Sequence, residues 1–288
     1  MLILALLALS AGAQPPIAQR PDVPSPSAPP SPDATPIEAL AAGFPAPGGA
    51  LRIGLWMGRP LMSASAGELR STARLVAPGG EVDAFTVKAT LDPSDLEGRD
   101  RIQVYGDLLA PPGSYELELE LTLGPDTARA TFPFEVEPPS PDRPSLLPPF
   151  FLDDEGLVAP FFEGPAPREM PADYPFMAIG ESFVPDISPR VTEEMPRSRV
   201  CLIGRGLGDE KTFLESGLVF ADGTLLSKER LAAVGHDETD ETGYETLCLG
   251  LDTQGLEVGS YQLNVVLHDF ENKTSDATEL QFEIRPAP

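Results

Sequence analysis

The feature that most constrains this chain is an alternation of apolar and polar residues that occurs twice. The apolar positions of the first copy are Tyr115, Leu117, Leu119, Leu121 and Leu123. Those of the second copy are Tyr261, Leu263, Val265 and Leu267. Successive side chains of a β-strand point to opposite faces, so each copy predicts a strand with one buried face and one solvent face. Strands of this kind belong to antiparallel sheets, in which one face packs on a core.

The two alternating stretches are parts of a longer internal repeat. Residues 112–117 read PGSYEL and residues 258–263 read VGSYQL, and each is followed by a second run that closes on Phe-Glu-Val or Phe-Glu-Ile. In Greek-key sandwiches, a tyrosine at the start of a late strand donates its hydroxyl to the upstream backbone, and we predict this tyrosine-corner role for Tyr115 and Tyr261. The repeat predicts an all-β chain of two tandem sandwiches, immunoglobulin-like or fibronectin-III-like, over residues 51–137 and 175–286. The alternative is a pair of unrelated β domains that share a common hairpin.

Shorter runs of similar character predict the remaining strands at 51–57, 69–76, 82–91, 102–105, 200–204, 217–221 and 245–251. Pro133 lies on the outward face of the strand predicted at 130–136 and indicates an edge strand or a bulge, because proline has no amide to donate to a ladder. The stretch SKERLAAV at 227–234 predicts one short helix, with Ser227 as its N-cap.

The first thirteen residues, MLILALLALSAGA, form an apolar run that ends in small residues. This pattern is typical of a secretory signal peptide, and the run is shorter than a membrane-spanning helix. We therefore expect residues 1–13 to be removed, the mature chain to begin at Gln14, and the protein to be secreted, periplasmic or located in the cell envelope. No Lys or Arg precedes the apolar run, and a buried N-terminal segment is the alternative interpretation.

Two further segments are rich in proline, and the chain contains 34 Pro in all. Because proline lacks an amide donor and fixes φ, residues 14–50 predict an extended, semi-rigid tether. Residues 138–174 predict an inter-domain segment of another kind, because it carries large apolar residues: Leu146, Leu147, Phe150, Phe151, Leu152, Phe161 and Phe162. Free linkers rarely expose such residues, so this segment either docks on a neighbouring sandwich or forms a strip that binds a partner.

The charge of the chain limits its partners. Its 20 Lys+Arg against 45 Asp+Glu give a formal net charge of −25. Since phosphate binding needs a Lys/Arg surface, we expect no nucleic-acid partner and no binding to anionic membrane surfaces. No other apolar run approaches the length of a spanning helix, so we also expect no membrane insertion of the mature chain.

Patterns that carry catalysis are scarce. The chain has two histidines, His236 and His268, and it contains no Gly-x-Ser-x-Gly elbow, HExxH, P-loop or dinucleotide fingerprint. We therefore predict no catalytic residues, no cofactor and no enzymatic activity. The predicted function is adhesion, scaffolding or protein binding at the cell envelope, with an envelope or extracellular protein as the partner. A carbohydrate- or small-ligand-binding module is the alternative, and an enzyme of unknown class is the third hypothesis.

One acidic run has the composition of a cation site. Asp237, Glu238, Asp240 and Glu241 are closely spaced, and hard cations such as calcium bind several carboxylate oxygens. The spacing of these residues differs from that of calcium-binding loops. An exposed acidic hairpin loop is therefore the favoured interpretation, and we assign no metal.

The only two cysteines, Cys201 and Cys248, are predicted to form a disulfide, because an exported compartment favours oxidation. The alternation places Val200 and Leu202 inward and therefore Cys201 outward, and the leucines around Cys248 place that residue outward as well. The bond would then join neighbouring antiparallel strands on the outer face of one sheet. Two reduced thiols are the alternative.

Several segments resemble a known family. Residues 174–191 (YPFMAIGESFVPDISPRV), 199–207 (RVCLIGRGL) and 256–267 (LEVGSYQLNVVL) resemble the C-terminal all-β region of bacterial secreted von Willebrand factor A-related proteins, and residues 106–121 (GDLLAPPGSYELELEL) resemble the preceding module there. The resemblance implies export and paired all-β modules. The chain has no Asp-x-Ser-x-Ser, the metal-site signature of the A domain, so none of that domain's ligand binding is implied.

Overall fold

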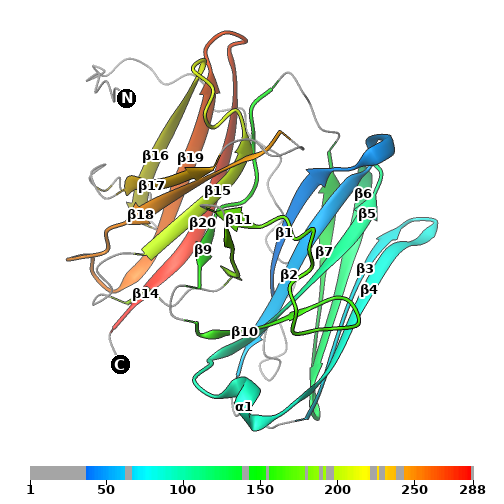
Figure 1. The fold of residues 1–288 in the computed structure, drawn as a ribbon. Helices are drawn as coiled ribbons and strands as arrows, with labels where there is room; N and C mark the ends of the chain where they lie inside the picture. Colours follow the sequence, from blue (N-terminus) through cyan, green and yellow to red (C-terminus); the bar gives the residue numbers. More distant parts are fainter. Residues whose placement is uncertain are drawn as a thin grey trace. The chain divides into compact units, whose positions relative to one another are not determined.

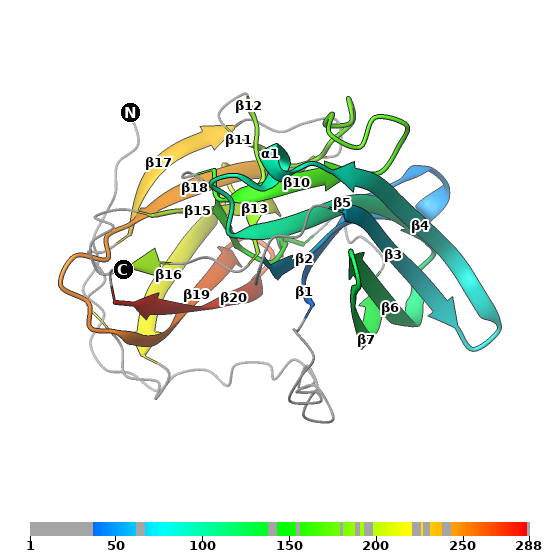
Figure 2. The ribbon, with the colours of Figure 1, turned by 90° about the horizontal axis from the view of Figure 1, so that it is seen from below.

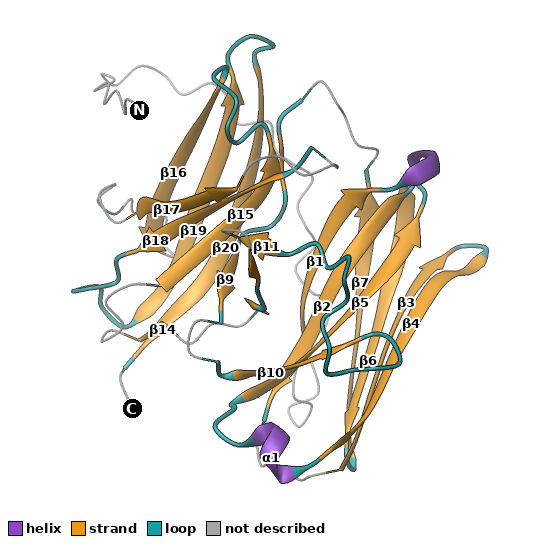
Figure 3. Cartoon of the chain, viewed as in Figure 1, coloured by secondary structure: helices purple, strands orange, loops and turns teal. Residues whose placement is uncertain are grey.

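The computed structural model describes residues 37–61, 67–137, 143–153, 156–178, 181–187, 191–192, 198–220, 226, 231–237 and 243–286. Within these ranges helix is limited to a single α-helical turn, α1 (Pro93–Leu96), and one 3-10 turn, η1 (Pro47–Gly49), and the other regular elements are strands (Figure 3). The all-β class is therefore confirmed. The predicted signal peptide at 1–13 and the predicted tether up to residue 36 lie outside the described residues. No helix in the described ranges is long and apolar enough to cross a membrane.

The first sandwich consists of two four-stranded sheets that pack face to face (Figures 1 and 2). One sheet has the order β1 (Glu38–Pro45), β2 (Leu51–Pro60), β5 (Arg101–Ala110) and β10 (Val158–Phe162). The other has the order β4 (Gly80–Leu91), β3 (Gly67–Ala77), β6 (Gly113–Leu123) and β7 (Asp126–Val136). Alternate residues of the facing strands form the core, among them Leu55 and Met57 of β2 and Leu119 and Leu121 of β6. The alternation in β6 therefore does mark a buried face, and β7, which carries Pro133, is an edge strand.

The second sandwich also consists of two facing sheets, of six and four strands. One sheet has the order β13 (Pro185–Asp186), β9 (Phe150–Leu152), β15 (Ser198–Arg205), β18 (Glu245–Leu251) and β17 (Leu231–Asp237), and β8 (Ser145–Leu146) also pairs with β15. The facing sheet has the order β14 (Val191–Thr192), β20 (Thr274–Arg285), β19 (Gly259–Asp269) and β16 (Thr212–Phe220). Its core includes Val200 and Leu249 of one sheet and Leu263 and Val265 of the other. A separate pair of two-residue strands consists of β11 (Met177–Ala178) and β12 (Glu181–Ser182).

The hairpins β6–β7 and β19–β20 pair in the same register. Tyr115 lies opposite Phe134 in the first, and Tyr261 lies opposite Phe282 in the second. Away from this hairpin, the edge strands of the two copies differ. β4 pairs with β3, whereas β17, at the same place along the chain, pairs with β18 in the other sheet of its sandwich. The two copies therefore share the strand pairing of the hairpin, whereas β4 and β17 belong to different sheets of their sandwiches.

Both repeat tyrosines make the hydrogen bond of a tyrosine corner. The Tyr115 hydroxyl donates to the Pro111 carbonyl at 2.6 Å, and the Tyr261 hydroxyl donates to the Glu257 carbonyl at 2.7 Å. Each acceptor lies four residues upstream, and both tyrosine side chains are buried. The bond fixes the entry of the chain into the hairpin, because it ties the start of the strand to the loop before it.

Tyr115→Phe and Tyr261→Phe are each expected to lower the free energy of unfolding by about 1 kcal/mol, because each change removes one hydrogen bond of a buried tyrosine. Urea denaturation of each variant measures this loss. Ser260→Ala, at an exposed position beside Tyr261, is the control and should stay close to the parent. A parent-like midpoint for both phenylalanine variants would contradict the role of the corner.

The tether predicted over residues 14–50 is too long at its C-terminal end. Glu38–Pro45 forms β1, which pairs antiparallel with β2. The sequence EALAAGFP has mostly small side chains, so its alternation is weak, yet Ala42 and Phe44 are buried. The pairing with β2 supplies the order that the local sequence does not indicate.

The prediction of a helix at 227–234 is wrong for residues 231–234, which the structure describes as strand. Residues 227–230 lie outside the described ranges, and Leu231–Asp237 forms β17, which pairs with β18 through a bulge at Val234. An isolated stretch of eight residues is too short to be stable as a helix. A ladder with a neighbouring strand satisfies its backbone groups instead.

The inter-domain segment packs, as the docking interpretation expects. Its strands β8 and β9 pair with β15 of the second sandwich, and β10 pairs in parallel with β5 of the first. Six of its large apolar residues are buried: Leu146, Leu147, Phe150, Phe151, Phe161 and Phe162. These phenylalanines do not form an exposed strip, so the partner-strip interpretation is wrong.

A third group of buried residues lies between the sheet of β5 in the first sandwich and the sheet of β15 in the second. We call it the inter-sandwich cluster. It contains Phe44, Trp56, Tyr105, Phe150, Phe162, Tyr174, Phe176, Cys201, Ile203, Tyr244 and Cys248, with smaller neighbours. Trp56 and Tyr105 lie opposite each other on the central strand pair of one sheet, and Cys201 and Cys248 lie opposite each other on the central pair of the other. Ring contacts such as Phe44 with Tyr244, at 5.9 Å between centroids, connect the two sheets.

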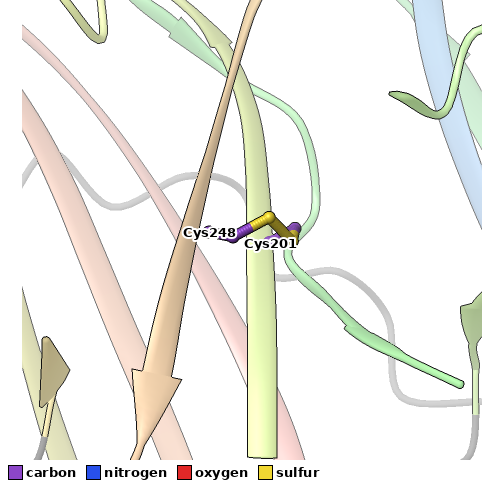
Figure 4. The surroundings of a disulfide bond; sticks show 2 residues. All are labelled: Cys201 and Cys248. Carbon is purple, nitrogen blue, oxygen red and sulfur yellow. A yellow bond between two sulfur atoms is a disulfide. The ribbon is translucent and has the colours of Figure 1, made fainter. Parts of the chain in front are cut away.

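The two cysteines form a disulfide that joins β15 to β18 (Figure 4). Their side chains point away from the core of the second sandwich, as the alternation predicts. The expected solvent face is nevertheless absent there, because the inter-sandwich cluster covers it and both cysteines are at most 1% exposed.

Candidate functional site

The acidic run at 237–241 gives no cation site in the part of the chain that the structure describes. Asp237 ends β17, and Glu238, Asp240 and Glu241 lie outside the described residues. Among the described residues, no group of three His, Cys, Asp or Glu side chains is placed to hold a metal ion.

His236, at the end of the same strand, pairs with a carboxylate. Its Nε2 lies 2.9 Å from Oε2 of Glu245, at the start of β18. The backbone of Gly208 lies against this pair, since a Cβ there would be 2.6 Å from Glu245 Oε2 and 2.8 Å from His236 Cε1. Gly208 leaves no space for a substrate beside the pair. We therefore interpret the His236–Glu245 contact as a structural one, which joins β17 to β18 and packs against the loop at 206–209.

A second polar group lies at the end of β5. Asp107 accepts hydrogen bonds from Arg52 Nη2 and from the Tyr105 hydroxyl, each at 2.5 Å. Burial, reinforced by the negative charge of Asp107, raises the pKa of Tyr105 far above its usual range. Burial also raises the pKa of the nearby Glu163 carboxyl, which accepts from the Asp107 amide. Tyr105 therefore stays protonated as a donor, and its bond to Asp107 links the inter-sandwich cluster, to which Tyr105 belongs, to the Arg52–Asp107 ion pair.

Two phenylalanines of the described residues are strongly exposed, one on the outer face of β16 and one in the turn after β19. Phe213 of β16 lies opposite His268 of β19, and Phe270 follows β19 in the turn to β20. We call these three residues the aromatic patch. Phe213 is 51% exposed and Phe270 is 67% exposed. The centroid of the Phe213 ring lies 6.4 Å from that of the His268 ring, with the two planes stacked at 23°. It lies 6.3 Å from the centroid of the Phe270 ring, with the two planes tilted by 33°.

The turn that carries Phe270 is held by two sets of bonds. Asp269 Oδ1 accepts from the amides of Glu271 and Asn272 at 2.9 Å each, and these bonds, with one from the Asn272 side chain, lower the pKa of the Asp269 carboxyl. The Phe270 amide donates to the carbonyl of Lys211, just before β16. Phe270 is thereby fixed beside Phe213 although 57 positions separate them in the sequence.

Polar side chains surround the aromatic patch on the same face. Glu215 Oε2 lies 3.4 Å from His268 Nε2, and the Glu215 side chain is 52% exposed. Farther along the sheet, Gln262 Nε2 donates to Asn264 Oδ1 and to Glu279 Oε2, both at 2.7 Å. The face thus combines exposed rings at one end with amides and carboxylates along its length.

Sequence alternation places His268 outward, and it does the same for Phe213 through inward Leu214 and Leu218. Alternation does not show that Phe213, His268 and Phe270 touch. That contact depends on the register between β16 and β19 and on the turn after β19.

Comparisons with known proteins give little. No protein-family model matches the sequence, and no curated protein matches it. A solved family 123 glycoside hydrolase from Clostridium perfringens shares 11% identity at a TM-score of 0.27. The match covers 34% of this chain and 22% of the hydrolase, and a likeness this low carries no argument about fold or function.

Proposed function

We propose that this chain is an exported, non-catalytic binding protein of the cell envelope, and that it binds a protein partner through the aromatic patch. One observation carries the proposal: Phe213 and Phe270 are in ring contact and are 51% and 67% exposed. Aromatic residues are enriched in protein–protein interfaces, and contiguous exposed apolar side chains mark interaction sites.

Two further observations support this proposal. The buried disulfide is compatible with an oxidising compartment, as is the apolar run at residues 1–13. The turn that holds Phe270 is tied to its neighbours by several hydrogen bonds. A surface that is fixed before binding loses little conformational freedom on association.

Carbohydrate binding is the second candidate. The amides of Gln262 and Asn264 and the carboxylate of Glu279 lie on the same sheet face as the aromatic patch. Such groups hydrogen-bond to hydroxyls, and sugar rings present hydroxyls together with apolar faces. This arrangement favours a glycan over other small ligands.

The double variant Phe213→Ala, Phe270→Ala tests the site. We expect the double variant to capture at least tenfold less partner protein from envelope extracts than the parent captures. The reason is that truncation of central aromatic residues removes most of the binding energy of an interface. Quantitative mass spectrometry of the retained proteins measures this difference, and affinity electrophoresis in soluble polysaccharides tests the second candidate.

The control is Val258→Ala, which alters another exposed apolar residue, 53% exposed, of the second sandwich. It should retain the partner as the parent does, and all three proteins should melt at similar temperatures. Equal retention by the parent and the double variant would show that the aromatic patch is not the binding surface.

A further inference from the structure

We infer that the partner of the aromatic patch is a basic protein segment whose arginine side chains stack on Phe213 and Phe270 and pair with Glu215. This inference rests on the proposed function and names the chemistry of the partner. It starts from the position of Glu215 relative to Phe213. The two residues are two apart on β16, so their side chains share one face about 7 Å apart along the strand.

A guanidinium group can contact the Phe213 ring and the Glu215 carboxylate at once, and Glu215, which is 52% exposed, can keep its contact with His268. The guanidinium is planar and cationic, so it stacks on an aromatic face, and its N–H groups form a fork that matches a carboxylate. An ammonium group makes the charge contact without the planar stack. A ring and a carboxylate at this spacing therefore favour arginine over lysine.

The chain itself contains this combination elsewhere. The guanidinium carbon of Arg168 lies 5.9 Å from the Phe161 ring centroid, while its Nη2 lies 2.6 Å from Asp95 Oδ2. Arg205 lies over the Tyr244 ring at 5.3 Å, a second contact of an arginine with an aromatic ring. At the aromatic patch the ring and the carboxylate come from this chain, and the arginine would come from the partner.

Charge complementarity indicates the same partner. The chain has a net charge of −25, and Asp209, Glu210, Glu215, Asp269 and Glu271 lie on or next to the strands and turn that carry the patch. Two lysines, Lys211 and Lys273, lie in the same region, and Lys211 is paired with Glu271 at 2.5 Å, so acidic residues remain in excess there. An acidic surface raises the local concentration of cationic partners and increases their association rate.

The test uses a fluorescein-labelled peptide of four Arg-Ser-Gly repeats, its lysine counterpart, and the full-length mature protein, with binding followed by fluorescence anisotropy at low and high salt.

The variant Phe213→Leu, Phe270→Leu keeps the apolar character and the net charge but removes the rings. We expect it to bind the arginine peptide five- to tenfold more weakly than the parent. Glu215→Gln should weaken binding about threefold, and Val258→Ala should have no effect. The lysine peptide should bind the parent several-fold more weakly than the arginine peptide does.

Equal binding of both peptides to the parent and to the leucine variant would overturn the inference, because it would reduce the interaction to diffuse attraction by net charge. If envelope extracts yield a partner that depends on Phe213 and Phe270 while the peptide shows no such dependence, the proposed function stands and this inference fails. A polysaccharide retained in a patch-dependent manner would also overturn it, in favour of a glycan. If neither experiment depends on the aromatic patch, the proposed function fails as well.

Discussion

Replacing Cys201 and Cys248 together by alanine is expected to lower the free energy of unfolding by about 4 kcal/mol, because the disulfide joins two residues 47 positions apart and so restricts the unfolded chain. Both sulfurs are buried in the inter-sandwich cluster, so the loss should appear as a lower melting temperature without a change in surface properties. Denaturant unfolding of the oxidised parent and the double variant measures the difference.

Chemical reduction gives the matched comparison, since it breaks the same bond without removing atoms from the cluster. Because the bond is at most 1% exposed, a mild reductant should act on it only after denaturant opens the fold. Rapid reduction of the native protein, or a double variant as stable as the parent, would contradict this account of the disulfide.

Trp56→Ala is expected to lower the free energy of unfolding by about 3–5 kcal/mol, because truncating a large, fully buried aromatic residue leaves a cavity. Trp56 is 0% exposed and its ring contacts Tyr105, Phe162 and Tyr174. Its Nε1 donates to the Tyr174 hydroxyl at 3.1 Å, so the variant also loses a buried hydrogen bond. Differential scanning calorimetry is the suitable measurement, since the change removes the only tryptophan.

Trp56→Phe retains part of the ring volume and should cost less than the alanine variant. Since the inter-sandwich cluster takes side chains from both sandwiches, the whole calorimetric transition should move to lower temperature. Two separate transitions, of which one stays in place, would show that the cluster does not couple the two sandwiches.

The strands were the most predictable part of the fold. β6 and β19 alternate cleanly, since their inward residues meet a facing sheet and their outward residues meet solvent. The strand predicted at 245–251 has the bounds of β18. β17 and β1 were missed because neither has a clear alternation, and both are held by pairing with a stronger neighbour.

The sequence predicts which side of a strand a residue lies on better than it predicts what covers that side. Alternation places Cys201 and Cys248 outward, and they are buried because chain from other parts of the sequence covers that sheet. The same limit applies to the aromatic patch. The outward direction of Phe213 and His268 follows from their neighbours, whereas the contact with Phe270 requires a register and a turn that no local pattern encodes.

The inter-domain segment also determines how the gene for this protein can be divided. Along the chain, β8 and β9 belong to the second sandwich and precede β10, which belongs to the first. No single cut between residues 137 and 175 therefore leaves both sandwiches complete. A fragment that ends at Val136 lacks β10 and leaves an edge of β5 open to pairing with other molecules, whereas a fragment that begins at Tyr174 lacks the strands that complete the sheet of β15. Expression of the two halves as separate proteins requires overlapping fragments, in which residues 143–164 are present twice.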